Sequence, residues 1–226
     1  MNGPYLIEGL DCSGKKSVAA EVVKRLRILG VVCDTVIGPF VQGPLGWLDH
    51  RLTASAGSSS PLLPILRLVK RLVYAAGPVV DGVAYRAPVG TLVVKVSSHF
   101  RAWARAELDR DTIMLAAFTK TRRWHIHFSG GTLLRTQFHI RLARHEQDAA
   151  SGRVKKSAAY RFLDQTGVAF DEWHTILRRL MREHVPDTLE LESSVLSPEA
   201  IAERVAGHIL TLHKIRRTSG STPSET

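Results

Sequence analysis

The stretch GLDCSGKKS, at residues 9–17, has residue types and a spacing that are suited to binding phosphate groups. A glycine is followed after four residues by Gly14 and Lys15, as in the G-x-x-x-x-G-K-[ST] pattern of phosphate-binding loops. Glycines let the backbone turn sharply, so that consecutive N–H groups surround anionic oxygens, and the lysine reaches the outer phosphates. Lys16 departs from the pattern, because a serine or threonine is usual there.

The segments that flank this loop are those that would position it. The apolar run PYLIEG at 4–9 predicts a buried strand. Residues 15–29 predict an amphipathic helix, and the side chains that share its apolar face are Val18, Val22, Leu26 and Leu29. VVCDTVI at 31–37 predicts a second strand. A strand, a helix and a strand in this order predict a parallel sheet and favour a working phosphate loop over a chance match.

The rest of the chain continues the alternation of strands and helices. Further strands are expected at 90–96, at about 132–137 and at 187–192. Helices are expected at 45–52, 62–76, 97–123, 168–184 and 197–213. We therefore predict an α/β fold of three layers, with a mostly parallel sheet flanked by helices. One domain is expected over 1–216, followed by a polar and disordered tail at 217–226.

Composition and charge restrict the partners and the compartment. The formal net charge of +10 over 226 residues predicts anionic partners, although a basic surface that only keeps the protein in solution is the alternative. Only two cysteines are present, which favours a reducing cytoplasm. No apolar run approaches the roughly 20 residues of a membrane span, and the first residues lack a signal-peptide pattern. We expect a cytoplasmic protein that does not bind membranes.

The loop and its approach, YLIEGLDCSGKKS, resemble the thymidylate kinase family, whose loop reads E-G-x-D-x-[SA]-G-K-[ST]-T. The matching residues are Glu8, Gly9, Asp11, Ser13, Gly14 and Lys15. Weaker resemblances over nearly the whole chain involve Pro39, Gly46, Arg144, Arg161 and Phe162. The resemblance implies a P-loop kinase fold with a small helical lid at about 148–165.

The resemblance also implies a site that binds ATP, normally with Mg²⁺. ATP would contact the loop residues Gly9, Leu10, Asp11, Cys12, Ser13, Gly14, Lys15, Lys16 and Ser17. The catalytic residues would be Lys15 and Asp11 of the loop and Arg153 and Arg161 of the lid. A small phosphorylated acceptor would be bound by Arg67, Arg71, Ser98 and Arg101. For the lid and for the arginines on 62–76, solvated surface charge is the alternative explanation.

Three departures from the family affect the metal and the acceptor. Lys16 replaces the hydroxyl that helps to hold Mg²⁺. The stretch SSHFR at 97–101 has serine where the family has the aspartate of D-R-[YF], and Ile37 and Gly38 replace an arginine and a glutamate. Either the Lys16 ammonium partly replaces the metal's charge, or water and Asp11 hold the metal, or catalysis is lost. The metal ligands are therefore unknown from sequence.

Several other residues that could do chemistry have a simpler explanation. Cys12 could have a lowered pKa near a helix start and Lys15, but a small filler of the loop is the simpler reading. His125 and His127 would share one side of a strand, and without a further ligand they do not predict a metal site. The sequence Asp109-Arg110-Asp111 is interpreted as charge on a helix surface.

The sequence leaves three functions open. The first is a phosphotransferase that moves the γ-phosphoryl group of ATP to a nucleoside monophosphate or a related small acceptor. The second is a catalytically silent nucleotide-binding protein with a regulatory or scaffolding role, which Lys16 and Ser97–Ser98 favour. A nucleic-acid binder ranks last, because no recognition motif accompanies the positive charge. Members of the family that the loop resembles are often homodimers, but no interface is legible in the sequence.

Overall fold

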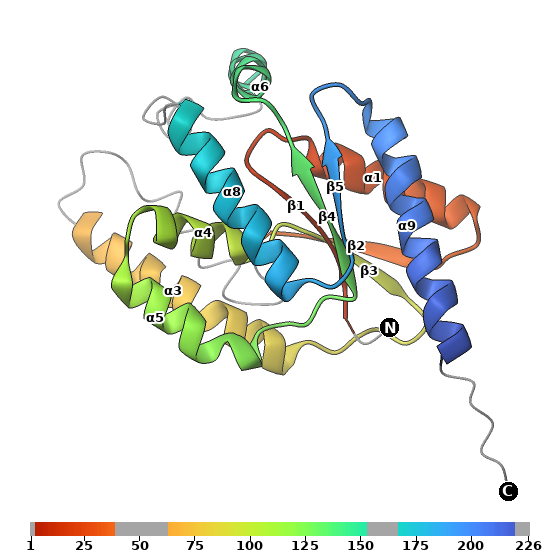
Figure 1. Cartoon of the computed structure of the whole chain (residues 1–226), viewed down its shortest axis with the longest axis horizontal. Coiled ribbons are helices and arrows are strands. Elements are labelled where there is room, and N and C mark those ends of the chain that lie inside the picture. The colour runs from red at the N-terminus through yellow and green to blue at the C-terminus, as the bar shows by residue number, and fades with distance from the viewer. Residues whose placement is uncertain (1–2, 39–62, 153–166, 220–226) are drawn as a thin grey trace, which may run out of the picture.

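The fold is built on one parallel sheet. We describe it from a computed structural model, in residues 3–38, 63–152 and 167–219. Five strands lie in the order β2-β3-β1-β4-β5, and every neighbouring pair is parallel. They are β1 (Tyr5–Gly9), β2 (Cys33–Ile37), β3 (Leu92–Val96), β4 (Gly130–Arg135) and β5 (Thr188–Glu192). The first strand is therefore central, with β3 on one side and β4 on the other. The loop that follows it lies at the carboxyl end of the strands, in the middle of the sheet (Figure 1).

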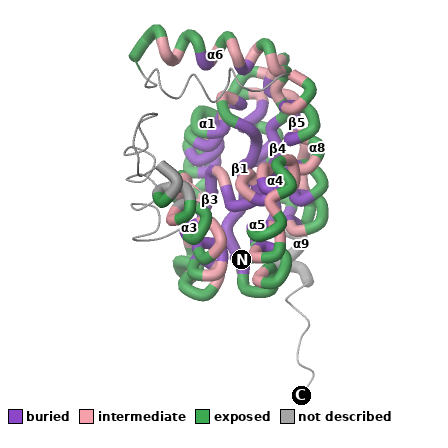
Figure 2. The backbone as a smooth tube through the Cα atoms, turned by 90° about the vertical axis from the view of Figure 1, so that its left-hand side faces the viewer, coloured by how far each residue is buried: buried purple, intermediate pink, exposed green. Residues whose placement is uncertain are grey.

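Helices cover both faces of the sheet and complete three layers, as predicted. On one face, α1 (Lys15–Ile28) and α9 (Pro198–Ser219) share a core with the strands through residues such as Val22, Leu26 and Ile209. On the other face, α4 (Phe100–Leu108), α5 (Thr112–Thr121) and α8 (Gly167–His184) enclose a second, aromatic-rich core. The buried sheet runs between the two cores (Figure 2).

Two further helices complete the arrangement. Helix α3 (Leu63–Ala84) packs against α5 and the short 3₁₀ turn η1 (Arg122–Trp124). Helix α6 (Phe138–Ala150) starts just after β4 and lies across the end of the sheet where the strands finish (Figures 1 and 2). In a parallel sheet this end is where ligands bind. No helix within the described ranges is long and apolar enough to cross a membrane.

The predicted long helix over 97–123 is wrong, because the chain breaks it into α4 and α5. The break lies at Arg110, which has a left-handed φ of 54°. The carboxylate of Asp111 then accepts a hydrogen bond from the N–H of Met114 at 3.2 Å and caps α5. Asp109-Arg110-Asp111 is therefore a helix-ending and helix-starting turn, and not charge on a helix surface.

Other boundaries differ from the expectations in smaller ways. Helix α3 runs on to Ala84 through Pro78, well past the expected end at 76. The fourth strand begins two residues earlier than expected, at Gly130. His125 and His127 lie between η1 and β4 and not on a strand, with His125 buried and His127 exposed. The helix expected at 45–52 and most of the expected lid lie outside the described residues.

Candidate functional site

The loop after β1 has the backbone shape that phosphate binding requires. Gly14 adopts a left-handed φ of 83° immediately before α1, and Cys12 is also left-handed at 58°. Gly9 has no room for a side chain, because a Cβ atom there would lie 2.7 Å from the carbonyl oxygen of Leu134 and from Ser13 Oγ. The loop therefore folds tightly between β4 and α1, and the positive end of the α1 dipole faces it.

Lys15 is the buried cation of this loop. It is only 8% exposed, and its Nζ donates hydrogen bonds to the carbonyl oxygen of Leu10 at 2.7 Å and to Ser13 Oγ at 3.4 Å. Both acceptors are neutral, and no carboxylate in the described part of the chain forms an ion pair with the ammonium. Burial, and secondarily Arg101, lower the pKa of Lys15 to about 8, against the opposing pull of Asp11 and Glu8.

The carboxylate of Asp11 is already paired with an arginine. Arg101 Nη2 lies 2.5 Å from Asp11 Oδ1, and the Asp11 side chain is about half exposed, at 51%. Desolvation raises the pKa of Asp11, but the charges of Arg101, Lys15 and Arg141 outweigh it and hold the pKa below its usual value. Asp11 therefore remains ionised, and Arg101 holds its side chain in place within the loop.

Glu8 and Ser98 form a buried connection beneath the loop. Glu8 is fully buried, and its Oε2 accepts hydrogen bonds from the N–H and the hydroxyl of Ser98, both at 2.7 Å. Its Oε1 accepts from the N–H of Gly9 at 3.0 Å. The serine at 98, which was expected to contact the acceptor, thus holds the end of β3 to the end of β1.

Two arginines of α6 also contact the loop. Arg141 is 1% exposed, and its Nε donates to the carbonyl oxygen of Asp11 at 2.6 Å. Its guanidinium carbon lies 3.7 Å from the centre of the Phe170 ring, and burial lowers the pKa of Arg141 to about 9. Arg144 donates to the carbonyl oxygens of Cys12 at 3.4 Å and of Ser193 at 2.9 Å.

The structure also contains a buried charge that the sequence reasoning did not single out. Lys95 lies on β3 with no exposed surface, and its Nζ donates to the carbonyl oxygen of Gly38 at 2.9 Å. Burial lowers the pKa of Lys95 to about 8, although Asp81 and Glu8 oppose the shift. The available signal was a lysine near the end of the apolar run GTLVVKV. Arg141 had a weaker signal, since it shares a helix face with Arg144 at a spacing of three residues.

The structure does not place the remaining predicted residues at the site. Arg71 is exposed on α3 and pairs with Asp111 at 2.7 Å. The side chain of Arg67, and both Arg153 and Arg161, lie outside the described residues. The suggestion of a lowered pKa at Cys12 is wrong, because burial, and then the charge of Asp11, raise the pKa of this thiol.

A Mg²⁺ ion held as in other phosphate loops does not fit the residues of this site. Lys16 and Ser17 are exposed on the first turn of α1, and Lys16 offers no oxygen to a cation. The Asp11 carboxylate is bound to Arg101. Throughout the described residues, no group of three or more His, Cys, Asp or Glu side chains is arranged to hold a metal ion.

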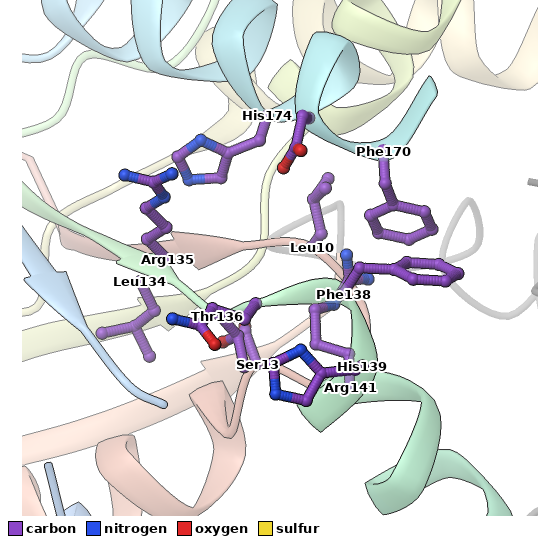
Figure 3. A pocket seen from close by; sticks show the side chains of 12 residues that line it. Leu10, Ser13, Leu134, Arg135, Thr136, Phe138, His139, Arg141, Phe170 and His174 are labelled. Carbon is purple, nitrogen blue, oxygen red and sulfur yellow. The ribbon is translucent and has the colours of Figure 1, made fainter. Parts of the chain in front are cut away.

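A cavity of about 280 Å³ opens directly beside the loop (Figure 3). Leu10 and Ser13 line it from the loop, and Phe170 and His174 line it from α8. The segment 134–139 and Arg141, at the end of β4 and the start of α6, supply most of the remaining wall. Burial, and then the charge of Arg135, lower the pKa of His174 to about 4, so that its ring is neutral at pH 7. The cavity combines aromatic rings with arginine side chains, which suits a ligand with a ring and an anionic group.

The chain was compared with family models and with curated proteins. No family model matches the chain, and a search of curated proteins finds no match. The functional assignment therefore depends on the geometry of the loop and of the residues around it.

Proposed function

We propose that the chain is a phosphotransferase that resembles thymidylate kinase and binds ATP at the loop between β1 and α1. The observation that carries the proposal is the Lys15 ammonium, which is buried at the start of a helix and lacks a carboxylate partner among the described residues. A buried charge without a counter-ion is costly, and an anionic ligand removes that cost. The parallel sheet supports the proposal, because the loop leaves its central strand.

In this proposal the loop positions the phosphates and its cations stabilise their charge. Backbone N–H groups and the α1 dipole would hold the phosphate oxygens, and Lys15 would turn from Leu10 to the outer phosphates. Arg101 and Arg141, which both contact Asp11, would stabilise the charge that spreads over the transferred group. Arg153 and Arg161 would close over it if the lid has the role that the resemblance implies.

The acceptor is proposed as a nucleoside monophosphate or a related small phosphorylated molecule. The cavity beside the loop, with its aromatic and arginine side chains, supports an acceptor of this class. Arg101 is the residue from the expected acceptor set that lies at the loop, through its contact with Asp11. Ser98 and Arg71 are already engaged, by Glu8 and by Asp111.

A second function is favoured by those same engaged residues. If Ser98 and Arg71 do not bind an acceptor, and Lys16 does not hold a metal, the loop would bind nucleotide without transferring phosphate. The chain would then be a catalytically silent nucleotide-binding protein with a regulatory or scaffolding role. ATP binding is common to both functions, and turnover separates them.

The deciding experiment combines calorimetry with a coupled assay of ADP release. ATP should bind the wild type and the control Lys24→Met, which removes an exposed lysine of the same helix, but not Lys15→Met. A panel of nucleoside monophosphates, tested with and without Mg²⁺, should then contain an acceptor that accelerates ADP release. Binding without any responsive acceptor would leave the silent protein as the function. Absence of ATP binding to the folded wild type would refute both.

A further inference from the structure

Positive charge is unusually concentrated around the phosphate loop. Lys15 is inside it, Lys16 follows it on α1, and Arg101 contacts it from α4. Arg141 and Arg144 contact it from α6. Among the described residues, the carboxylates nearby are those of Asp11, which is matched by Arg101, of Glu8, which is buried against Ser98, and of Asp148 on α6, whose charge acts on Cys12. The loop therefore carries a surplus of cations before any ligand binds.

One of these cations, Lys16, occupies the position where a phosphate loop usually has a metal ligand. In a general phosphate loop the hydroxyl after the lysine binds Mg²⁺, and the metal then neutralises part of the triphosphate charge. Here that position is Lys16, an exposed ammonium on the first turn of α1. A cation at the hydroxyl position repels a metal ion and attracts the phosphate oxygens that the ion would have bound.

Two buried donors indicate that the site has room for more negative charge than it contains. The Lys15 ammonium hydrogen-bonds only to a carbonyl and a hydroxyl oxygen. Arg101 Nε is buried and has no hydrogen-bond partner within the described part of the chain, although Nη2 of the same side chain pairs with Asp11. Buried donors are normally satisfied, so the unpaired Nε of Arg101, whose side chain contacts Asp11 of the loop, points to an anionic ligand.

We propose that this loop binds the metal-free triphosphate anion, with Lys16, Arg101 and Arg141 supplying the positive charge that Mg²⁺ supplies in other phosphate loops. The inference rests on the proposed function, because it names the form of the nucleotide that the same site takes. The inference makes a prediction that the proposed function alone does not make. A site built for the Mg²⁺ complex loses affinity when the metal is removed, and this one keeps it.

The experiment is calorimetry with ATP and with inorganic tripolyphosphate, each in excess EDTA and in excess Mg²⁺ at matched ionic strength. Affinity in EDTA should equal or exceed affinity in Mg²⁺ for both ligands. Tripolyphosphate separates the contribution of the phosphates from that of the base. Matched ionic strength is needed because the chain's net charge of +10 attracts any polyanion in a salt-dependent way.

Two variants test whether Lys16 supplies this positive charge. Lys16→Thr restores a hydroxyl and removes one cation, so affinity for metal-free ATP should fall about tenfold and Mg²⁺ should recover part of it. Lys24→Thr is the matched control, since it removes a lysine that is 68% exposed further along the same helix. It should leave both affinities unchanged.

The outcomes separate this inference from the proposed function. ATP that binds more weakly in EDTA than in Mg²⁺ would overturn the inference and leave the proposed function standing. Equal behaviour of Lys16→Thr and Lys24→Thr would overturn the assignment of the charge to Lys16. No binding of either ligand in either buffer would refute the proposed function itself, and the inference with it.

Discussion

Acidification should destabilise this protein through a buried histidine, His125. The ring is 6% exposed, with its centre 4.6 Å from that of His99 and 6.0 Å from that of Trp103. Burial, followed by the charges of His184 on α8 and His127 on its own loop, lowers the pKa of His125 from 6.5 to about 4. The unfolded chain therefore binds a proton near pH 6.5 that the folded chain refuses until about pH 4. Stability is lost as the pH falls through this window.

The hydrogen bonding of His125 explains why protonation of its neutral ring is unfavourable. Thr121 Oγ1 donates to the carbonyl oxygen of Ala117 at 2.7 Å, so it can only accept from His125 Nε2, which lies 2.9 Å away. The neutral ring already carries its proton on Nε2, and a second proton would have to go to Nδ1. Between pH 7 and pH 5, a pKa of about 4 instead of 6.5 corresponds to about 2 kcal/mol of lost stability. Local relaxation would reduce this value to roughly 1–2 kcal/mol.

Urea unfolding at pH 7 and pH 5 measures the effect. Wild type should lose roughly 1–2 kcal/mol more than His125→Gln over this range, because glutamine cannot titrate. His127→Gln, which removes the smallest of the causes that lower the pKa of His125, should lose only slightly less stability than wild type over this range. The slope with pH is the relevant quantity, since the substitution can also change stability at pH 7. Parallel pH curves for wild type and His125→Gln would show that the burial argument is wrong.

Three further predictions follow from named contacts. Affinity for ATP should fall up to about tenfold between pH 7 and pH 9, because Lys15, with a pKa of about 8 before ligand binds, loses its proton over this range; a flat calorimetric profile would argue against it. Ser98→Ala should cost roughly 2 kcal/mol in urea unfolding, since the buried Glu8 carboxylate loses a hydroxyl donor at 2.7 Å, and a loss below about 0.5 kcal/mol would contradict this. Gly82→Ala in α3 should cost about 2 kcal/mol or more, because the new Cβ would meet the carbonyl oxygen of Trp124 at 1.8 Å. Gly207→Ala in α9 meets nothing within 4 Å and should stabilise by about 0.5–1 kcal/mol, so equal effects of the two substitutions would refute the packing argument.

Local patterns were enough to predict the elements around the loop. The apolar run before Gly9 and the spacing of Val18, Val22 and Leu26 predicted β1 and α1, and the structure confirms both. These features depend on neighbouring residues, so sequence alone contains them. The break at Arg110 was missed because a left-handed arginine has no reliable local signal. The contacts of Arg101 with Asp11 and of Arg141 with the same loop were missed for another reason, since they join residues far apart in the chain.

The departures at residues 16 and 98 are best understood together with the buried carboxylate of Glu8. Ser98 gives Glu8 two hydrogen bonds, and an aspartate at that position would instead place a second carboxylate against Glu8 Oε2. Serine at 98 and lysine at 16 thus change the charge near the loop in the same direction, towards positive. Taken one at a time, these two departures from the family that the loop resembles would suggest independent losses of metal or acceptor contacts. Their common electrostatic effect, next to the buried Lys15, instead supports the proposal that the loop binds a metal-free phosphate chain.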